Sequence, residues 1–363
     1  MEQRLKQLAY NSGAAAVGIA NAERLIDKPS MDPNYLLPWA RSVISVMLPF
    51  DDEIVRMYLA KKDRPAMQIH ETEIYRGLEE ISRKLADELL FNGFRAVAAE
   101  SNLDYRFKQK FGWKIVPYPV RQALLDWLSS PCGPLERRFR KSIVELLFEY
   151  AMRAPSWRLT PTISHRYAAV AAGLGTIGWS GNVLHPKYGA RVLFNTVITD
   201  APLTPDPMDQ EIICDGCRRC VISCQGRFID AKREDSVFIG GQRFVHALRS
   251  NNLRCILVCA GFTGQSADEM WSTWSPGRFK LPASDEMLDD LWEWMVKTYL
   301  CDDNHYARTL ANLTFHTEYG HVRKPQDRFE ITCGNCQFVC ARNRQTRLQL
   351  SKLLRKSGAV QRH

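Results

Sequence analysis

Cys214-Asp-Gly-Cys217-Arg-Arg-Cys220-Val-Ile-Ser-Cys224 places four cysteines at the spacing C-x2-C-x2-C-x3-C. This spacing is typical of bacterial ferredoxins that carry two 4Fe-4S clusters. Three thiolates on one tight loop reach three irons of one cluster, while the fourth, on the following helix, ligates the other cluster. The run therefore predicts a double-cluster module and a second cysteine motif elsewhere in the chain.

The second motif is Cys333-Gly-Asn-Cys336-Gln-Phe-Val-Cys340, with the spacing C-x2-C-x3-C, which lacks one ligand of the full run. By the same crossing rule, its last cysteine belongs to the first cluster. The first cluster is therefore predicted to be held by Cys214, Cys217, Cys220 and Cys340.

The second cluster then has three ligands in the two motifs and needs one more. Those three are Cys224, Cys333 and Cys336. We predict Cys255 as the eighth ligand, with Cys259 and Cys301 as alternatives.

Zinc is an alternative to iron, because paired C-x2-C motifs also bind zinc tetrahedrally. The three-then-one spacing, repeated in shortened form, fits clusters better than a zinc ribbon. Proline usually follows the last cysteine of a ferredoxin run, whereas Gln225 and Ala341 stand at these positions. This departure slightly weakens the match.

The composition is that of a soluble globular protein with room for two domains: 363 residues, 45% hydrophobic and 25% charged. The first 20 residues include Glu2, Arg4 and Lys6 and so lack the apolar stretch of a secretory signal. No segment has the roughly 18 to 20 consecutive apolar residues of a membrane-spanning helix. We therefore expect a cytoplasmic protein without a membrane partner.

The cysteines are concentrated in the C-terminal part of the chain. Of the 11, only Cys132 precedes Cys214. Cytoplasmic thiol systems keep such cysteines reduced, so metal ligation explains them better than disulfides do.

The formal net charge is +9, which raises the question of nucleic-acid binding. Basic residues without any acidic residue follow Ala341: Arg342, Arg344, Arg347, Lys352, Arg355, Lys356 and Arg362. This segment is read as a solvated tail, with binding to RNA or to an acidic protein as the alternative.

The first 200 residues alternate helix-like and strand-like stretches, a pattern typical of an α/β domain. Apolar residues at helical spacing predict a helix through Ile74–Leu89 that stops near Asn92-Gly93, and a second helix over Phe139–Tyr150. Val43–Leu48 and Val192–Ile198 are predicted to be buried strands.

Proline-rich residues 201–207 mark the domain boundary. We predict an α/β domain over 1–205, a cluster domain over 206–345 with an inserted helical segment at about 260–332, and a basic tail over 346–363. The tryptophans of the insertion are expected to pack in its core rather than to bind a cofactor.

Several blocks of the sequence resemble the superfamily of cobalamin-dependent iron–sulfur enzymes that contains epoxyqueuosine reductases and reductive dehalogenases. The first blocks are Ala16–Ala20 and Leu37–Val46, which resemble the opening strands of that superfamily. The next are Ala172-Gly-Leu-Gly-Thr-Ile-Gly178 and Ile198–Leu203, followed by the cysteine run. The order of the blocks is also similar.

The resemblance implies a nitroreductase-like α/β domain that holds cobalamin, followed by a ferredoxin-like α+β module with two 4Fe-4S clusters. The clusters would deliver electrons from an external donor such as ferredoxin or flavodoxin, and the cofactor would cleave a bond to oxygen or halogen in a small-molecule or tRNA-borne substrate. Arg41 and the loop from Gly173 to Gly178 are the implied cofactor contacts. Glycines allow backbone to approach a flat ligand closely, so Gly173, Gly175, Gly178 and Gly189 are candidate contacts, although simple turns also explain them.

The resemblance also shows departures. Epoxyqueuosine reductases carry an aspartate, the presumed proton donor, where Leu159 stands here. His165, Tyr167 and Tyr188 are the nearby residue types that could donate a proton instead, and each could equally be structural. The chain ends at His363, without the helical-repeat domain of many epoxyqueuosine reductases, and we expect a divergent branch with a different substrate.

Three functions remain open from the sequence. The first is a cobalamin-dependent reductase. The second is an iron–sulfur electron-transfer or assembly protein without a corrinoid, which the missing aspartate allows. The third is a tRNA-associated protein, whose affinity would fall steeply with salt.

Overall fold

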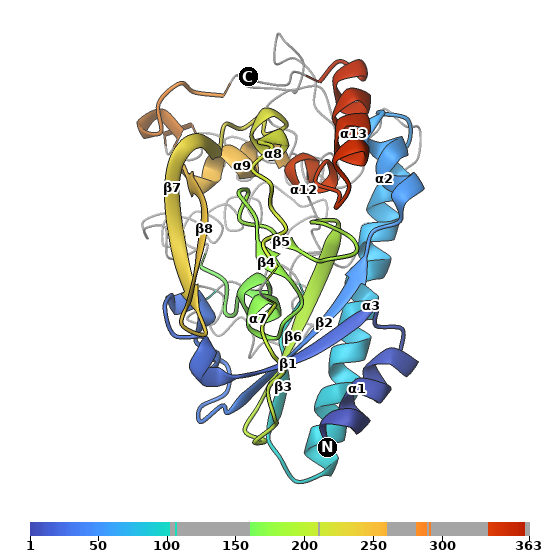
Figure 1. The fold of residues 1–363 in the computed structure, drawn as a ribbon, viewed down its shortest axis with the longest axis vertical. Helices are drawn as coiled ribbons and strands as arrows, with labels where there is room; N and C mark the ends of the chain where they lie inside the picture. Colours follow the sequence, from blue (N-terminus) through green and yellow to red (C-terminus); the bar gives the residue numbers. More distant parts are fainter. Residues whose placement is uncertain are drawn as a thin grey trace, which may run out of the picture.

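The computed structural model describes residues 1–101, 106, 160–209, 211–259, 281–288, 290–291 and 333–359 (Figure 1). The α-helices are α1 (Glu2–Asn11), α2 (Asp52–Leu59), α3 (Arg64–Phe91), α7 (His165–Ala171), α8 (Arg219–Ile222), α9 (Asn252–Cys259), α12 (Asn335–Phe338) and α13 (Arg344–Lys356). Short 3-10 helices are Ala22–Arg24, Pro29–Met31 and Pro33–Tyr35. The strands are β1 (Ala16–Asn21), β2 (Ser42–Pro49), β3 (Ala96–Ala98), β4 (Thr176–Ile177), β5 (Val183–Leu184), β6 (Val192–Thr199), β7 (Ile229–Ile239) and β8 (Gln242–Arg249).

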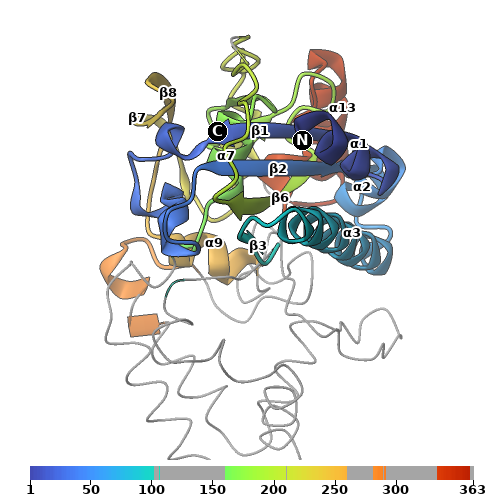
Figure 2. The same cartoon turned by 90° about the horizontal axis from the view of Figure 1, so that it is seen from below.

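The central sheet has four strands in the order β1-β2-β6-β3, and Figure 2 shows β1, β2 and β6 side by side. Ile44 on β2 lies opposite Ile19 on β1 and Val197 on β6. The two predicted strands are confirmed as β2 and β6. All pairs in this sheet are antiparallel, so the fold is a mixed arrangement of helices and strands without the parallel pairing that an alternating pattern favours.

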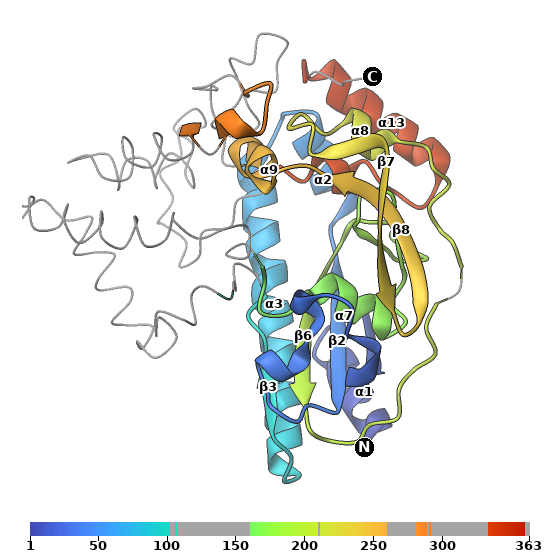
Figure 3. The same ribbon diagram turned by 90° about the vertical axis from the view of Figure 1, so that its left-hand side faces the viewer.

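Both faces of this sheet are buried. On one face, Ile44 and Val46 pack in a core with α1 and α3, and on the other face Val43 and Met47 pack in a core with α7. Figure 3 shows the resulting layers: α3, the sheet, α7 and the β7–β8 hairpin. Burial on both faces explains why β2 reads as a nearly continuous apolar run.

The predicted helix through Ile74–Leu89 is confirmed as the second half of α3. The carboxylate of Asp63 caps its start by accepting a hydrogen bond from the N–H of Ala66 at 2.9 Å. The helix ends before Asn92, and Gly93 follows with a φ of 84°. Asn-Gly therefore ends the helix in the way that its sequence predicts.

The C-terminal segment returns to the N-terminal half of the chain. Helix α13 packs beside α2 (Figure 1), and Leu350 and Leu354 are buried in the same core as α1 and α3. The prediction of a solvated tail is therefore wrong for residues 346–356, because apolar residues at helical spacing give that segment a buried face. Arg344, Lys352 and Arg355 remain exposed on it.

Some predictions lie outside the described residues. These are the helix over Phe139–Tyr150, most of the insertion at 260–332 with its tryptophans, Cys132, Cys301 and Leu159. Among the helices that the structure does describe, none combines the length and the apolar character needed to span a bilayer.

Candidate functional site

The first cysteine group consists of Cys214, Cys217, Cys220 and Cys340, which together line one small cavity. Burial, together with the neighbouring thiols of Cys214 and Cys217, raises the pKa of Cys340 to about 12. Cys340 follows α12 in the chain, yet it joins three cysteines of the earlier run. This is the grouping that the crossed spacing predicts, and its ligation of iron stays a prediction.

The second group consists of Cys224, Cys255, Cys333 and Cys336. Burial, together with the nearby thiols of Cys255 and Cys333, raises the pKa of Cys224 to about 12. Cys336 has a pKa raised by burial and then by Cys333, Cys224 and Cys255. Cys220 of the first group also acts on Cys336, so the two groups adjoin.

The two cysteine motifs have the same local backbone. Arg218 and Gly334 each follow a cysteine and adopt left-handed conformations, with φ of 56° and 57°. Each left-handed residue is followed by a four-residue helix, α8 or α12. The helix contains the next cysteine, Cys220 or Cys336, and the last cysteine of each motif follows the helix. Figure 1 shows α8, α9 and α12 together at one end of the molecule. The two motifs therefore share one local backbone geometry.

The cysteines are suited to clusters by their surroundings. Among the described residues, no three His, Cys, Asp or Glu side chains lie close enough together to hold a single metal ion. The first group instead stands around a cavity. The N–H groups of Trp179 and Phe228 donate to the Sγ atoms of Cys214 and Cys224, each at 3.3 Å. Such N–H donors stabilise cluster sulfur and raise its reduction potential.

Two cysteines of α9 compete for the role of eighth ligand. The Sγ atoms of Cys255 and Cys259 lie 3.6 Å apart. Cys259 also hydrogen-bonds Cys333, which lowers the pKa of Cys333 to about 7. Cys255 is a close neighbour of both Cys224 and Cys336, so we keep Cys255 as the predicted ligand.

We expect Cys255→Ser to remove about four of roughly eight irons, because each cluster contains four. Cys259→Ser is the matched control on the same helix and should keep both clusters. Iron analysis of protein purified without oxygen measures the difference. Loss of iron from the Cys259 variant alone would assign the ligand to Cys259.

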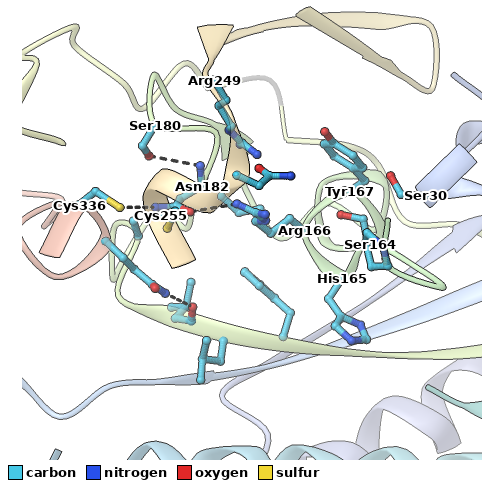
Figure 4. A pocket seen from close by; sticks show the side chains of 18 of the residues that line it. Ser30, Ser164, His165, Arg166, Tyr167, Ser180, Asn182, Arg249, Cys255 and Cys336 are labelled. Atoms are coloured by element: carbon cyan, nitrogen blue, oxygen red, sulfur yellow. Dashed lines mark hydrogen bonds between the residues drawn. The ribbon is translucent and has the colours of Figure 1, made fainter. Parts of the chain in front are cut away.

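A cavity of about 620 Å³ separates the second cysteine group from α7 (Figure 4). Cys255 and Cys336 line one side of it, and Tyr167 of α7 lines another. Apolar side chains of β6, Val192 and Phe194, also line it. Its size is within the range of small-molecule and cofactor sites.

His165 lines this cavity, but both of its ring nitrogens are engaged by the protein. Nε2 lies 2.9 Å from the carbonyl oxygen of Glu100, and Nδ1 lies 2.8 Å from Oγ1 of Thr196. A carbonyl oxygen only accepts, so Nε2 carries the proton and Nδ1 accepts from the threonine hydroxyl. His165 therefore ties α7 to β6, and its predicted role as a proton donor has no support in this geometry.

The two candidate tyrosines lie in different places. Tyr167 lines the cavity, close to Arg249. Tyr188 packs beside His185, with ring centroids 5.3 Å apart, and is not among the residues that line the cavity. Of the three predicted donors, Tyr167 lines the cavity and its hydroxyl makes no hydrogen bond to a described residue, whereas His165 is engaged at both nitrogens and Tyr188 does not line the cavity.

The predicted cofactor contacts do not line the cavity. Arg41 is exposed. A Cβ on any of the four glycines would overlap other parts of the chain: Pro207 at Gly173, Leu184 at Gly175 and Gly178, and Cys340 at Gly189. Close packing of the chain against itself therefore explains these glycines without a ligand.

Gly189 is the most informative of these glycines. It has a φ of 65°, and a Cβ there would overlap the carbonyl oxygen of Cys340. We expect Gly189→Ala to destabilise the protein by about 1–3 kcal/mol and to disturb the first cysteine group, because backbone cannot yield as a side chain can. Denaturant unfolding measures the loss of stability.

Gly93→Ala is the control, since Gly93 also has a positive φ but open space around it. Equal losses of stability in both variants would contradict the packing argument.

Two arginines of the cavity wall were not predicted from the sequence. Arg166 follows His165 on α7, and Arg249 is the last residue of β8. Nothing in their sequence context distinguishes them from other arginines in a basic protein. Only the fold brings a residue of the hairpin against a residue of α7.

No family model matches the chain. It is 28% identical over 145 residues to an epoxyqueuosine reductase of Synechococcus sp. (strain RCC307), which covers 39% of this chain and 43% of the relative. It is 31% identical over 81 residues to an epoxyqueuosine reductase of Bacillus cereus, covering 20% of this chain and 21% of the relative. The matches thus span less than half the length of these curated relatives.

Two solved structures align with this chain at low sequence identity. A catabolic reductive dehalogenase gives a TM-score of 0.46 at 15% identity, over 86% of this chain and 37% of its own. An epoxyqueuosine reductase bound to a stem loop of tRNA-Tyr gives a TM-score of 0.41 at 13% identity, over 99% of both chains. The similarity of this chain to proteins named epoxyqueuosine reductase rests on the sequence matches, which cover part of its length.

Proposed function

We propose that this protein is an iron–sulfur, corrinoid-dependent reductase. One observation carries the proposal: a single cavity is lined on one side by Cys255 and Cys336 of the second cysteine group and on another by Tyr167. Reductive cleavage of a bond requires electrons and a proton at the same place. The similarity to epoxyqueuosine reductases supports this reading.

The eight thiols of the two groups would hold two 4Fe-4S clusters. Cys217 is exposed, so the first group is the point where an external donor such as ferredoxin or flavodoxin would pass electrons to the protein. Cys220 and Cys336 are neighbours across the two groups, so electrons would continue to the second group and the cavity. When bound there, a corrinoid would supply low-valent cobalt, which reduces bonds from carbon to oxygen or halogen.

The chain's own residues would orient the cofactor and supply the proton. Val192 and Phe194 give the cavity an apolar surface suited to a flat macrocycle, and Tyr167 would hold the proton at its hydroxyl. The substrate would be a small molecule or a tRNA-borne nucleoside; the names of the curated relatives specify epoxyqueuosine. We place the enzyme in the cytoplasm, where its thiols stay reduced.

Metal analysis and visible spectroscopy test the proposal. The protein is purified without oxygen, incubated with cobalamin and freed from unbound excess. We expect about eight irons and about one cobalt per chain. Iron without retained cobalt would overturn the reductase reading and favour an electron-transfer or assembly protein.

A further inference from the structure

The guanidinium of Arg249 lines the cavity and forms no ion pair with a carboxylate of the described residues. Its acidic neighbours are the thiols of Cys255 and Cys336 and the hydroxyl of Tyr167. Nε of Arg249 is buried and makes no hydrogen bond to any described group. Burial, together with the like charge of Arg166, lowers the pKa of Arg249 to about 10. Arg249 is still protonated at neutral pH with this pKa. A buried charge of this kind is costly unless a partner of opposite charge approaches it.

The guanidinium of Arg249 is held in place by its packing. It lies directly against Gly181, where a Cβ would overlap the guanidinium group. Gly181 has a φ of 73°, which glycine adopts without strain. The absence of a side chain at Gly181 therefore creates the space that Arg249 occupies at the wall of the cavity.

Arg166 brings a second positive charge to the same wall. Its Nη1 donates to the carbonyl oxygen of Gly181 at 3.3 Å and to Oδ1 of Asn182 at 3.2 Å, both neutral acceptors. Figure 4 shows Arg166 and Arg249 directed toward the same region, with Asn182 between them and the cysteines. Neither arginine forms an ion pair with a carboxylate of the described residues. The two like charges repel each other, and a bound anion would reduce that repulsion.

We propose that Arg166 and Arg249 form an anion-binding subsite that receives a carboxylate, phenolate or phosphate group of a ligand in the cavity. Guanidinium groups suit this role because they present several donors in a plane that matches such anions. The inference rests on the proposed function for the identity of the ligand. The anion belongs either to the substrate or to the phosphate of the corrinoid's nucleotide loop.

Two titrations separate these sources in protein that carries its clusters. Cobalamin contains the phosphate, whereas cobinamide lacks it. If the subsite binds the cofactor, Arg249→Gln should weaken cobalamin binding by about tenfold to a hundredfold and leave cobinamide binding unchanged. If the subsite binds the substrate, both corrinoids should bind as before, while benzoate and inorganic phosphate should lose a similar factor in affinity.

Two further variants exclude simpler causes. Gly181→Ala keeps the charge but displaces the guanidinium, so it should reproduce the loss caused by Arg249→Gln. Arg243→Gln removes an exposed charge from the same strand and should bind every probe as the wild type does. Calorimetric titration with each probe, together with the visible spectrum of the corrinoid, measures all four proteins.

Unchanged affinity for cobalamin, cobinamide, benzoate and phosphate in both Arg249→Gln and Gly181→Ala would overturn the subsite. Arg249 would then be only a counter-charge for the neighbouring Cys336 and Cys255. A different result would overturn the reductase proposal alone: wild-type protein that retains no corrinoid but binds phosphate in an Arg249-dependent way.

Discussion

Replacing Cys340 with serine is expected to remove the first cluster and leave the second intact. Cys340 lines one cavity with Cys214, Cys217 and Cys220, so its loss would open a cluster whose other ligands lie far back in the sequence. The iron content should fall from about eight to about four per chain. Electron paramagnetic resonance of the reduced protein identifies the cluster that remains.

Cys336→Ser is the matched control, because Cys336 lies in the same short motif but in the other group. Its residual spectrum should equal that of Cys224→Ser, whereas the residual spectrum of Cys340→Ser should equal that of Cys214→Ser. Identical residual spectra for Cys336→Ser and Cys340→Ser would mean that the motif serves one cluster only. The crossed arrangement would then be wrong.

Tyr167→Phe is expected to lower the turnover of a reducible substrate by about 10²- to 10⁴-fold, the usual contribution of a positioned proton donor. The variant loses one hydroxyl from the cavity wall and should keep its clusters, its corrinoid and its stability. Single-turnover reduction by chemically reduced protein measures the effect without dependence on an electron donor. A solvent isotope effect on that step should change with the variant if the hydroxyl supplies the proton.

Two control variants limit the interpretation of this result. Tyr188→Phe should react like the wild type, since Tyr188 does not line the cavity. Glu100 does line it, so Glu100→Gln tests a competing carboxyl donor. Full activity in Tyr167→Phe together with its loss in Glu100→Gln would reassign the proton to Glu100.

The cysteine groups could be read from the sequence because ligand spacing is a local property. A C-x2-C run specifies which thiols one loop can present, and the crossing of the last cysteine follows from the short helix after the loop. For the same reason the sequence predicts β2, β6 and α3 correctly, because the apolar pattern of each lies within a single element. Cys255 and Cys259 could not be separated, since they are neighbours on one helix.

The cavity wall could not be predicted, because residues from distant elements form it. Arg249 reaches it from the end of a hairpin, and Arg166 reaches it from α7. His165 has the residue type of a general acid, yet Thr196 and Glu100 occupy its nitrogens. The glycines were expected to face a ligand, whereas they face the chain itself. Composition shows that such residues exist, but only tertiary contacts decide what surrounds them.

The crossing of Cys340 into the first group also sets an order of events in biosynthesis. The ribosome makes Cys214, Cys217 and Cys220 early and supplies their fourth companion only after the whole intervening segment has emerged. If the first group holds a cluster, as we propose, a nascent chain offers only three of its four thiols until Cys340 is made. We therefore expect insertion of that cluster to follow synthesis of Cys340.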